Sequence, residues 1–305
     1  MTDVVHDVVR GLARRRWAER VRSIEPLEHG ITNSNYVIDL GDERFVVRLP
    51  GQNSELLGID RTNERRCGDL AAAVGVGPEV IDIDAATGCM VFRFIDGRAV
   101  PADELAREPM LGRFVSSLRL VHGAGPVAAT FDPFTIIRGY RDLAERRSVR
   151  APFDPDDAMT TLARIESVRP FRATVLGHND LLNANFLYDG RLRIVDWEYA
   201  GMGDPFFDLA NVAVNNDFDR RAETALLGHY FGEVTDELVN TLSLMKIVSE
   251  LREAWWGVVQ LAISSLDVDF ADYAGRRGRH AAALWADLEH DEVLASAAAL
   301  TARGR

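Results

Sequence analysis

The pattern of apolar and polar positions predicts strands early in the chain and helices over most of the rest. Residues 3–22 place apolar and Arg-rich polar positions at helical spacing, which is typical of an amphipathic surface helix. Short apolar runs bounded by turn residues predict strands at 24–28, 36–40, 44–49, 79–85 and 89–95, with a helix at 59–73. Helical patterns follow over 111–121, 139–147, 155–168, 218–231, 235–265, 270–287 and 290–302. The pattern therefore predicts an α+β protein whose strands come first.

One further hairpin is predicted within the helical part. Two short apolar runs, 185–188 and 191–197, flank Asp189-Gly190. This dipeptide favours a two-residue turn with positive φ at both positions. Such a turn would pair Tyr188 with Arg191 and would set the register of the whole hairpin.

In this register several polar side chains share one face of the hairpin. Asn185 lies opposite Ile194, and Asn183 lies opposite Asp196. Asn185 and Asp196 become diagonal neighbours at roughly 7–8 Å, where an amide oxygen and a carboxylate can share one hard cation. Asp180 lies just upstream, in the loop that leads into the first strand. We therefore expect a site that combines a metal with a base.

The spacing of these three residues is also found in protein kinases. A protein kinase carries a base Asp, a metal-binding Asn five positions later and a metal-binding Asp at the start of the next strand. Asp180, Asn185 and Asp196 have this spacing. Here His178-Asn-Asp180 replaces the His-Arg-Asp of protein kinases, and Asp196-Trp-Glu198 replaces their Asp-Phe-Gly.

Both replacements resemble small-molecule kinases related to aminoglycoside phosphotransferases and choline/ethanolamine kinases. The runs 194–200 and 208–211 resemble the choline/ethanolamine kinase branch most closely. The resemblance implies an α+β, bilobal protein-kinase-like fold. Its N-terminal lobe, residues 1–97, is an antiparallel β-sheet with one helix that binds the nucleotide. Its larger lobe, residues 98–305, is mainly helical and carries the catalytic and acceptor sites.

The resemblance also implies that the protein uses ATP and Mg²⁺. Asn185 and Asp196 would hold the metal, and Asp180 would orient the acceptor hydroxyl and take its proton. Asp208 resembles a buried aspartate of the family that holds the catalytic loop. His122 ends a predicted helix, and we expect it to be structural.

Two segments of the first lobe are candidates for nucleotide binding. Arg48 stands on a predicted strand where protein kinases carry the phosphate-binding Lys, and the next helix supplies Glu64 as its partner. Arginine suits carboxylates and phosphates, although such a pair is also common on protein surfaces. The loop 30–35, with Asn33 and Asn35, is small and polar enough to cover phosphates, but loops of this composition are often only turns.

The strand-to-helix junction that follows is the expected hinge between the lobes. By the resemblance, backbone groups from Arg93 to Ile95 would meet the adenine edge.

The acceptor site is predicted from four residues. Tyr199 matches a pocket tyrosine of the family, and Trp256, before a glycine, matches a pocket tryptophan. Glu253 and Asn215 lie at nearby positions. The second tryptophan of eukaryotic members is replaced by Val259, and their acidic residue by Asn215, so the aromatic and acidic cage is incomplete. Further candidates are Trp255, which also suits a helical core, Glu250 and Tyr230.

Composition narrows the class of protein. The 305 residues are 47% hydrophobic and 27% charged, which is ordinary for a globular protein long enough for two lobes. A net charge of −12 argues against general binding to nucleic acid or anionic lipid and favours a cationic substrate. We expect a cytoplasmic protein with two free thiols, because neither a membrane span nor a signal peptide is recognisable. Lys246 is the only lysine, so arginine must supply any other cationic contact to phosphate.

Three functions remain open from the sequence. The first is an ATP-dependent kinase of choline, ethanolamine or a related small amino-alcohol. The second is a kinase of an aminoglycoside or sugar-like hydroxyl compound. The third is a nucleotide-binding pseudokinase, which the intact Asp180, Asn185 and Asp196 disfavour. The choice between ATP and GTP, the oligomeric state and the pathway are also open.

Overall fold

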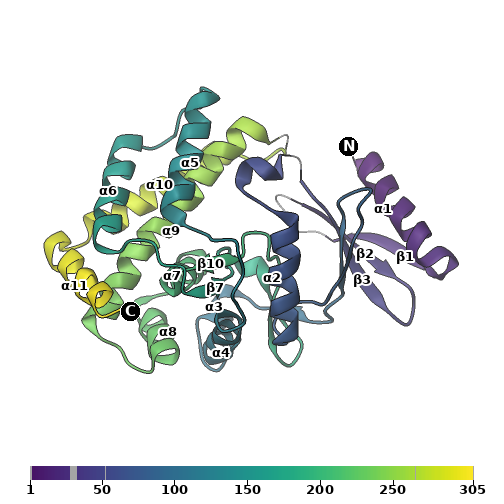
Figure 1. Ribbon diagram of the computed structural model, residues 1–305, viewed down its shortest axis with the longest axis horizontal. Helices are drawn as coiled ribbons and strands as arrows, with labels where there is room; N and C mark the ends of the chain where they lie inside the picture. Colours follow the sequence, from purple (N-terminus) through teal and green to yellow (C-terminus); the bar gives the residue numbers. More distant parts are fainter. Residues whose placement is uncertain (1, 28–32, 52, 265, 305) are drawn as a thin grey trace.

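The computed structural model describes residues 2–27, 33–51, 53–264 and 266–304. A smaller lobe with a β-sheet lies at one end of the molecule, and a larger, mostly helical lobe lies at the other (Figure 1). The N-terminus begins beside the sheet, and the C-terminus lies at the far side of the helical lobe. The predicted α+β, bilobal fold is confirmed. Part of the predicted phosphate loop, residues 30–32, lies outside the described residues. The lobe boundary at residue 97 stays a prediction.

The smaller lobe is built on a five-stranded antiparallel sheet of order β1-β2-β3-β5-β4. Its strands are β1 (Ser23–Leu27), β2 (Ser34–Asp39), β3 (Arg44–Leu49), β4 (Val80–Ile83) and β5 (Met90–Arg93). The first helix, α1 (Thr2–Trp17), packs on the sheet through Val9 and Leu12, which meet Ile38 and Val47. The alternation of buried and exposed residues in β2 and β3 creates this apolar face.

The second helix, α2 (Arg61–Ala73), lies between the sheet and the helical lobe (Figure 1). Asp60 caps it, because its carboxylate accepts hydrogen bonds from the backbone N–H groups of Thr62 and Asn63. This cap begins the helix one turn before Glu64, which is thereby directed toward β3.

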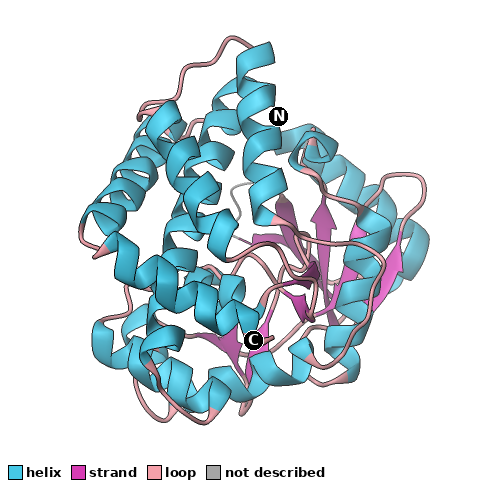
Figure 2. Cartoon of the chain, turned by 60° about the vertical axis from the view of Figure 1, so that its left-hand side comes forward, coloured by secondary structure: helices cyan, strands magenta, loops and turns pink. Residues whose placement is uncertain are grey.

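The larger lobe consists mainly of helices, shown in cyan in Figure 2. They are α3 (Ala102–Leu105), α4 (Met110–His122), α5 (Pro133–Arg146), α6 (Pro155–Val168), α7 (Pro205–Asn215), α8 (Arg220–Phe231), α9 (Asp236–Ile263), α10 (Phe270–Ala286) and α11 (His290–Ala302). The predicted bounds agree closely except for α5. It begins at Pro133, before the predicted residue 139, because Asp132 caps it and Pro133 suits the first helical position.

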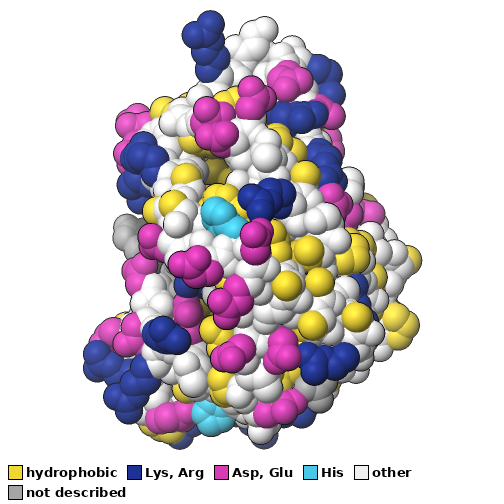
Figure 3. Space-filling view, turned by 90° about the vertical axis from the view of Figure 1, so that its left-hand side faces the viewer, with side chains coloured by type: hydrophobic (Ala, Val, Ile, Leu, Met, Phe, Trp, Pro, Cys, Tyr) yellow, Lys and Arg dark blue, Asp and Glu magenta, His cyan; other side chains and the backbone are white. Residues whose placement is uncertain are grey.

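Helix α9 is the central helix of this lobe. Nearly every residue between Leu244 and Gln260 is buried, because α5, α7, α10 and α11 pack around it. A helix buried on all sides can present polar residues to an internal site. None of the described helices is both long and apolar enough to cross a bilayer. On the face of the molecule shown in Figure 3, acidic and basic side chains are interspersed.

Two small sheets hold the two ends of the segment 178–185, which carries Asp180. One contains β6 (Arg98–Ala99), β8 (Phe186–Tyr188) and β9 (Leu192–Ile194), and the other pairs β7 (Val175–Gly177) with β10 (Gly201–Gly203).

The predicted register of the β8–β9 hairpin is wrong by one residue. Tyr188 pairs with Leu192, not with Arg191, and the connection has three residues. The Asp189 side chain explains the longer loop, since it accepts hydrogen bonds from the Arg191 backbone N–H at 3.1 Å and from Arg193 Nε at 3.0 Å. Gly190 supplies the positive φ, at 102°.

Both cysteines are fully buried, so we expect their thiols to react slowly in the folded protein. Burial raises the pKa of the Cys67 thiol to about 12, with a contribution from Glu64, and burial also raises the pKa of Cys89. Because the thiolate is the reactive form, we expect alkylation by iodoacetamide at pH 8 to be about a hundredfold or more slower than for a free thiol. Mass spectrometry before and after denaturation measures this. Rapid alkylation of either cysteine in the native protein would contradict it.

Candidate active site

The loop that follows β7 carries Asp180, and α7 holds its backbone. Asp208 in the first turn of α7 accepts hydrogen bonds from the backbone N–H groups of His178, at 2.8 Å, and Asn179, at 2.7 Å. Asn211 accepts one from the N–H of Leu181. These bonds fix the main chain on both sides of Asp180. The contacts of Asp208 are those expected of a residue that supports the loop.

His122 supports the same loop indirectly. Its Nε2 lies 2.9 Å from the Asp208 carboxylate, and its Nδ1 contacts the Tyr230 hydroxyl. Burial acts to raise the pKa of Asp208, but the hydrogen bond and electrostatic attraction of His122, together with His178, outweigh burial, and the pKa lies below its usual value. The structural role predicted for His122 agrees with this placement. Tyr230, considered above for the acceptor pocket, lies in this support instead.

Asp180 is buried and shares its environment with other charged groups. Its Oδ1 lies 3.1 Å from Nη1 of Arg252 on α9, and that guanidinium also pairs with Glu253. Burial raises the pKa of the Asp180 carboxyl, and Glu253 and Asp196 add to the rise, while Arg252 opposes it. A carboxylate with a raised pKa beside a reacting hydroxyl is suited to act as a general base.

Asn185 and Asp196 offer oxygen ligands beside this loop. The Asn185 Nδ2 donates to the backbone carbonyl of Asp180 at 2.9 Å, which leaves its Oδ1 available as a metal ligand. The backbone N–H of Val195 donates to the carbonyl of Asn185 at 3.0 Å, so Asp196 directly follows a residue bonded to Asn185. The two therefore lie close despite the wrong hairpin register.

These oxygens fit a hard cation such as Mg²⁺, which prefers one or two protein carboxylates completed by substrate phosphates and water. No cluster of three or more His, Cys, Asp or Glu side chains suited to a metal occurs among the described residues. The donor set is therefore suited to a metal that arrives with a nucleotide. Asp196 has a φ of 71°, which places its carboxylate against the first lobe, 2.8 Å from Arg48.

The predicted pair of Arg48 and Glu64 is present. Nη1 of Arg48 lies 2.7 Å from Glu64 Oε1, and both side chains are buried. Burial acts to lower the pKa of Arg48, but Asp196 and Glu64 outweigh it and raise the pKa. Arg48 therefore stays charged, between Glu64 of α2 and Asp196 of the second lobe. Asn35, another predicted nucleotide contact, is paired with Arg48 on the neighbouring strand, in the register of β2 and β3.

Glu198 extends this network and was not singled out from the sequence. Its Oε2 accepts hydrogen bonds from Asn33 Nδ2 at 2.9 Å and from Arg61 Nη1 at 3.1 Å. Arg61 also pairs with Glu64. The predicted residue Asn33 is thus bound to the second lobe. In the sequence, Glu198 could have been recognised as a candidate from its place as the third residue of Asp-Trp-Glu.

The expected hinge residues lie on the surface. The Arg93 guanidinium pairs with the exposed side chains of Glu79, at 2.7 Å, and Glu43, at 3.2 Å. Arg93 and Ile95 line a cavity of about 610 Å³, together with Gly77 and neighbouring residues. Arg48, Asn185 and Asp196 do not line this cavity. Backbone contacts from this segment to adenine stay a prediction.

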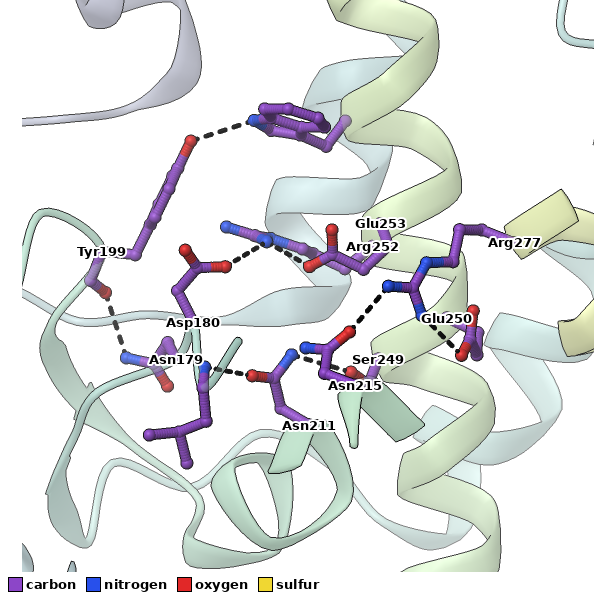
Figure 4. A network of polar contacts seen from close by, with 12 residues as sticks. Asn179, Asp180, Tyr199, Asn211, Asn215, Ser249, Glu250, Arg252, Glu253 and Arg277 are labelled. Carbon is purple, nitrogen blue, oxygen red and sulfur yellow. Dashed lines mark hydrogen bonds and ion pairs between the residues drawn. The ribbon is translucent and has the colours of Figure 1, made fainter. Parts of the chain in front are cut away.

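Aromatic and acidic residues predicted for the acceptor pocket lie next to Asp180. Trp256 Nε1 donates a hydrogen bond to the Tyr199 hydroxyl at 3.0 Å, and the Arg252 guanidinium lies 4.3 Å over the Tyr199 ring (Figure 4). Glu253 accepts a hydrogen bond from Tyr273 at 2.6 Å. Three of the four predicted acceptor residues are therefore joined to Asp180 through Arg252.

The fourth predicted acceptor residue lies in a neighbouring group. Asn215 accepts a hydrogen bond from Arg277 at 2.8 Å, and Arg277 pairs with Glu250 at 3.0 Å (Figure 4). Asn215 and Asp180 do not contact each other in this network, and an acceptor role for Asn215 stays a prediction. Trp255 packs against Phe153 at 5.3 Å, in the core.

Sequence reasoning missed Arg252, Tyr273 and Arg277. Arg252 directly precedes Glu253, so its place beside a predicted site residue was a weak signal. Tyr273 and Arg277 lie on α10, one turn apart, and no local motif marks them.

Comparison with known proteins identifies the family of the chain. The model of a family described as "Phosphotransferase enzyme family" matches residues 23–238, which is more than half of the chain. The chain belongs to the phosphotransferase enzyme family. Among its relatives in this family, Protein LicA of Haemophilus influenzae is 27% identical over 259 residues, covering 81% of this chain and 76% of LicA. Ethanolamine kinase 2 of Homo sapiens is 26% identical over 303 residues, covering 86% of this chain and 75% of that protein.

Solved structures show the same fold. A choline/ethanolamine kinase family protein from Mesorhizobium loti superimposes with a TM-score of 0.81 at 29% identity, covering 95% of this phosphotransferase chain and 98% of the other. Choline kinase LicA from Streptococcus pneumoniae gives a TM-score of 0.79 at 23% identity, with 93% and 99% covered. The resemblance to choline/ethanolamine kinases and the kinase-like fold expected from residues 178–211 are both confirmed. This member of the family is a phosphotransferase enzyme.

Proposed function

We propose that the protein is an ATP-dependent kinase that transfers the γ-phosphoryl group to the hydroxyl of choline, ethanolamine or a related small amino-alcohol. One observation carries this proposal. The carboxylate of Asp180 is joined through Arg252 to Glu253 and to the aromatic pair of Tyr199 and Trp256. A base therefore lies beside acidic and aromatic groups, which are the groups that hold organic ammonium ions.

The nucleotide would lie between the lobes. Arg48 would contact the phosphates, and its pairing with Glu64 keeps the guanidinium in place. Asn185 and Asp196 would hold Mg²⁺, which would neutralise charge on the phosphates when bound. Asn33 donates a hydrogen bond to Glu198 of the second lobe, so Asn33 would lie near the nucleotide.

Asp180 would act on the acceptor. One carboxylate oxygen is held by Arg252, so the other is free to accept the proton of the acceptor hydroxyl. As the new oxygen–phosphorus bond forms, the bond to the bridging oxygen of ADP breaks and the hydroxyl proton passes to Asp180. Because phosphoryl transfer needs mainly positioning and charge neutralisation, these few fixed groups are sufficient.

An ADP-release screen tests the acceptor. We expect Mg²⁺-dependent ADP release with choline, ethanolamine, methylated ethanolamines or another small amino-alcohol, above a blank made with the Asp180→Asn protein. The same screen includes simple sugars and aminoglycosides. If kcat/KM for one of these compounds exceeds that for every amino-alcohol, the acceptor is a sugar or aminoglycoside and not an amino-alcohol. ATP binding without ADP release for any alcohol would contradict kinase activity and favour a pseudokinase.

A further inference from the structure

Arg61, the first residue of α2, makes contacts in both lobes. Its Nη1 lies 2.5 Å from Oε2 of Glu64, one turn along the same helix, and 3.1 Å from Oε2 of Glu198 in the second lobe. Its Nη2 lies 3.5 Å from Oδ1 of Asn33. The side chains of Glu64 and Glu198 are only 1% and 3% exposed. Two buried carboxylates from different lobes therefore share one guanidinium.

The contact with Arg61 completes the hydrogen bonding of Glu64. Oε1 of Glu64 accepts from Arg48 at 2.7 Å, and Oε2 accepts from Arg61. Because each carboxylate oxygen is bound by a different arginine, the carboxyl group cannot rotate without losing a charged hydrogen bond. Arg48 is the cation that we place on the nucleotide phosphates. The orientation of Glu64, and with it the direction of the Arg48 guanidinium, therefore depends on Arg61.

The first turn of α2 also holds the segment that follows Asp196. Arg61 binds Glu198, and Asn63 Nδ2 donates a hydrogen bond to the backbone carbonyl of Ala200 at 2.7 Å. This helix lies between the sheet and the helical lobe (Figure 1). Two side chains from one helical turn therefore fix the segment 196–200 against the first lobe.

Another arginine of α2 shows an ordinary surface pairing. Arg65 lies 3.2 Å from Asp69 on the same helix, and both side chains are partly exposed. Such a pair is screened by solvent and contributes little. The contacts of Arg61 are largely shielded from water and cross between lobes, so their loss has a larger effect.

We propose that Arg61 is a positioning residue that aligns the nucleotide site across the two lobes. Through Glu64 it holds Arg48, and through Glu198 it holds the segment that begins with Asp196. The assignment rests on the proposed kinase function. All of these contacts lie within the chain, so nucleotide binding loses less free energy in ordering the groups that receive the phosphates and the metal.

Calorimetry with Mg²⁺ and a non-hydrolysable ATP analogue tests the assignment without turnover. For Arg61→Met we expect the dissociation constant to rise about tenfold or more, because two buried carboxylates lose their shared partner. Arg61→Lys keeps the charge but not the fork of donors, so it is expected to recover only part of the affinity. In the ADP-release assay, the KM for ATP is expected to rise in Arg61→Met while the KM for the acceptor is unchanged.

Two further variants separate positioning from general stability. Arg65→Met is the matched control on the same helix, and we expect it to keep the wild-type affinity. Glu198→Gln removes the charge at the contact between the lobes and is expected to weaken nucleotide binding. The double variant Arg61→Met/Glu198→Gln should bind more tightly than the product of the two single effects implies, because both changes remove the same contact.

The outcomes that overturn the assignment are equal affinities for wild type and Arg61→Met, an equal loss in Arg65→Met, or independent effects of Arg61 and Glu198. If Arg61→Met does not fold, Arg61→Lys and Glu198→Gln carry the same comparison.

The same measurements distinguish this assignment from the kinase proposal itself. Weaker nucleotide binding in Arg61→Met, with no ADP release by the wild type for any alcohol, supports the assignment and overturns the kinase function. ADP release by the wild type, with an unchanged KM for ATP in Arg61→Met, does the reverse. A wild-type protein that binds no nucleotide overturns both.

Discussion

Replacing Asp180 by Asn is expected to lower kcat by about 10²- to 10⁴-fold, the usual contribution of a general base. The amide has nearly the same shape as the carboxylate but cannot take the hydroxyl proton. Burial and the negative charges of Glu253 and Asp196 raise the pKa of Asp180, which makes it a stronger base than an exposed aspartate. A coupled ADP-release assay with the best acceptor from the screen measures the loss.

Nucleotide binding provides the control for this variant. Asp180 does not contact Arg48 or Glu64, so the affinity for Mg²⁺–ATP is expected to stay within a few-fold of the wild-type value. Calorimetric titration of both proteins checks this point. Near-normal turnover in Asp180→Asn would remove Asp180 from the role of base, whereas loss of both turnover and nucleotide binding would indicate a wider structural change.

The second large effect is expected for Asp196→Asn. A neutral amide is a weaker ligand for Mg²⁺ than a carboxylate. The lost stabilisation, several kcal/mol for a catalytic metal, corresponds to a fall in kcat on the order of 10³-fold. The Mg²⁺ concentration for half-maximal activity is expected to rise as well. Titration of ADP release with MgCl₂ at saturating ATP measures both quantities.

The same hairpin offers a matched control. Asp189 is also an aspartate next to a β-strand, but among the described residues its carboxylate bonds to the Arg191 backbone in the loop and to Arg193 on β9. Asp189→Asn is therefore expected to keep the wild-type Mg²⁺ requirement and to lose only a little stability. An unchanged Mg²⁺ requirement in Asp196→Asn would exclude Asp196 as a metal ligand.

The fold was largely predictable because most elements carry strong local signals. The strands of the first lobe are bounded by turn residues, and α6 follows Asp154-Pro155, which is a clear N-terminal cap. The β8–β9 register was not predictable from the Asp-Gly dipeptide alone. Hydrogen bonds that the Asp189 carboxylate accepts stabilise a loop one residue longer, and a shift of one residue reverses the faces of a strand.

The candidate site was predictable where its residues lie close together in sequence. Asp180, Asn185 and Asp196 share one loop and one hairpin, so spacing alone indicated their association. Arg252 is 72 positions from Asp180, and it lies on a helix that is buried on all sides. In such a helix the apolar pattern does not indicate which residues face the site. Trp255 and Trp256 also have different surroundings although they are adjacent in sequence, because successive helical residues point in directions about 100° apart.

The proposed role of Arg48 at the phosphate position has a consequence for how this enzyme can be detected. Lys246, the single lysine, lies on α9 and pairs with Glu223 of α8, away from Arg48 and Asp196. Affinity probes that acylate the phosphate-binding lysine of kinases therefore have no amine to label here. Chemoproteomic surveys based on that lysine would therefore pass over this enzyme.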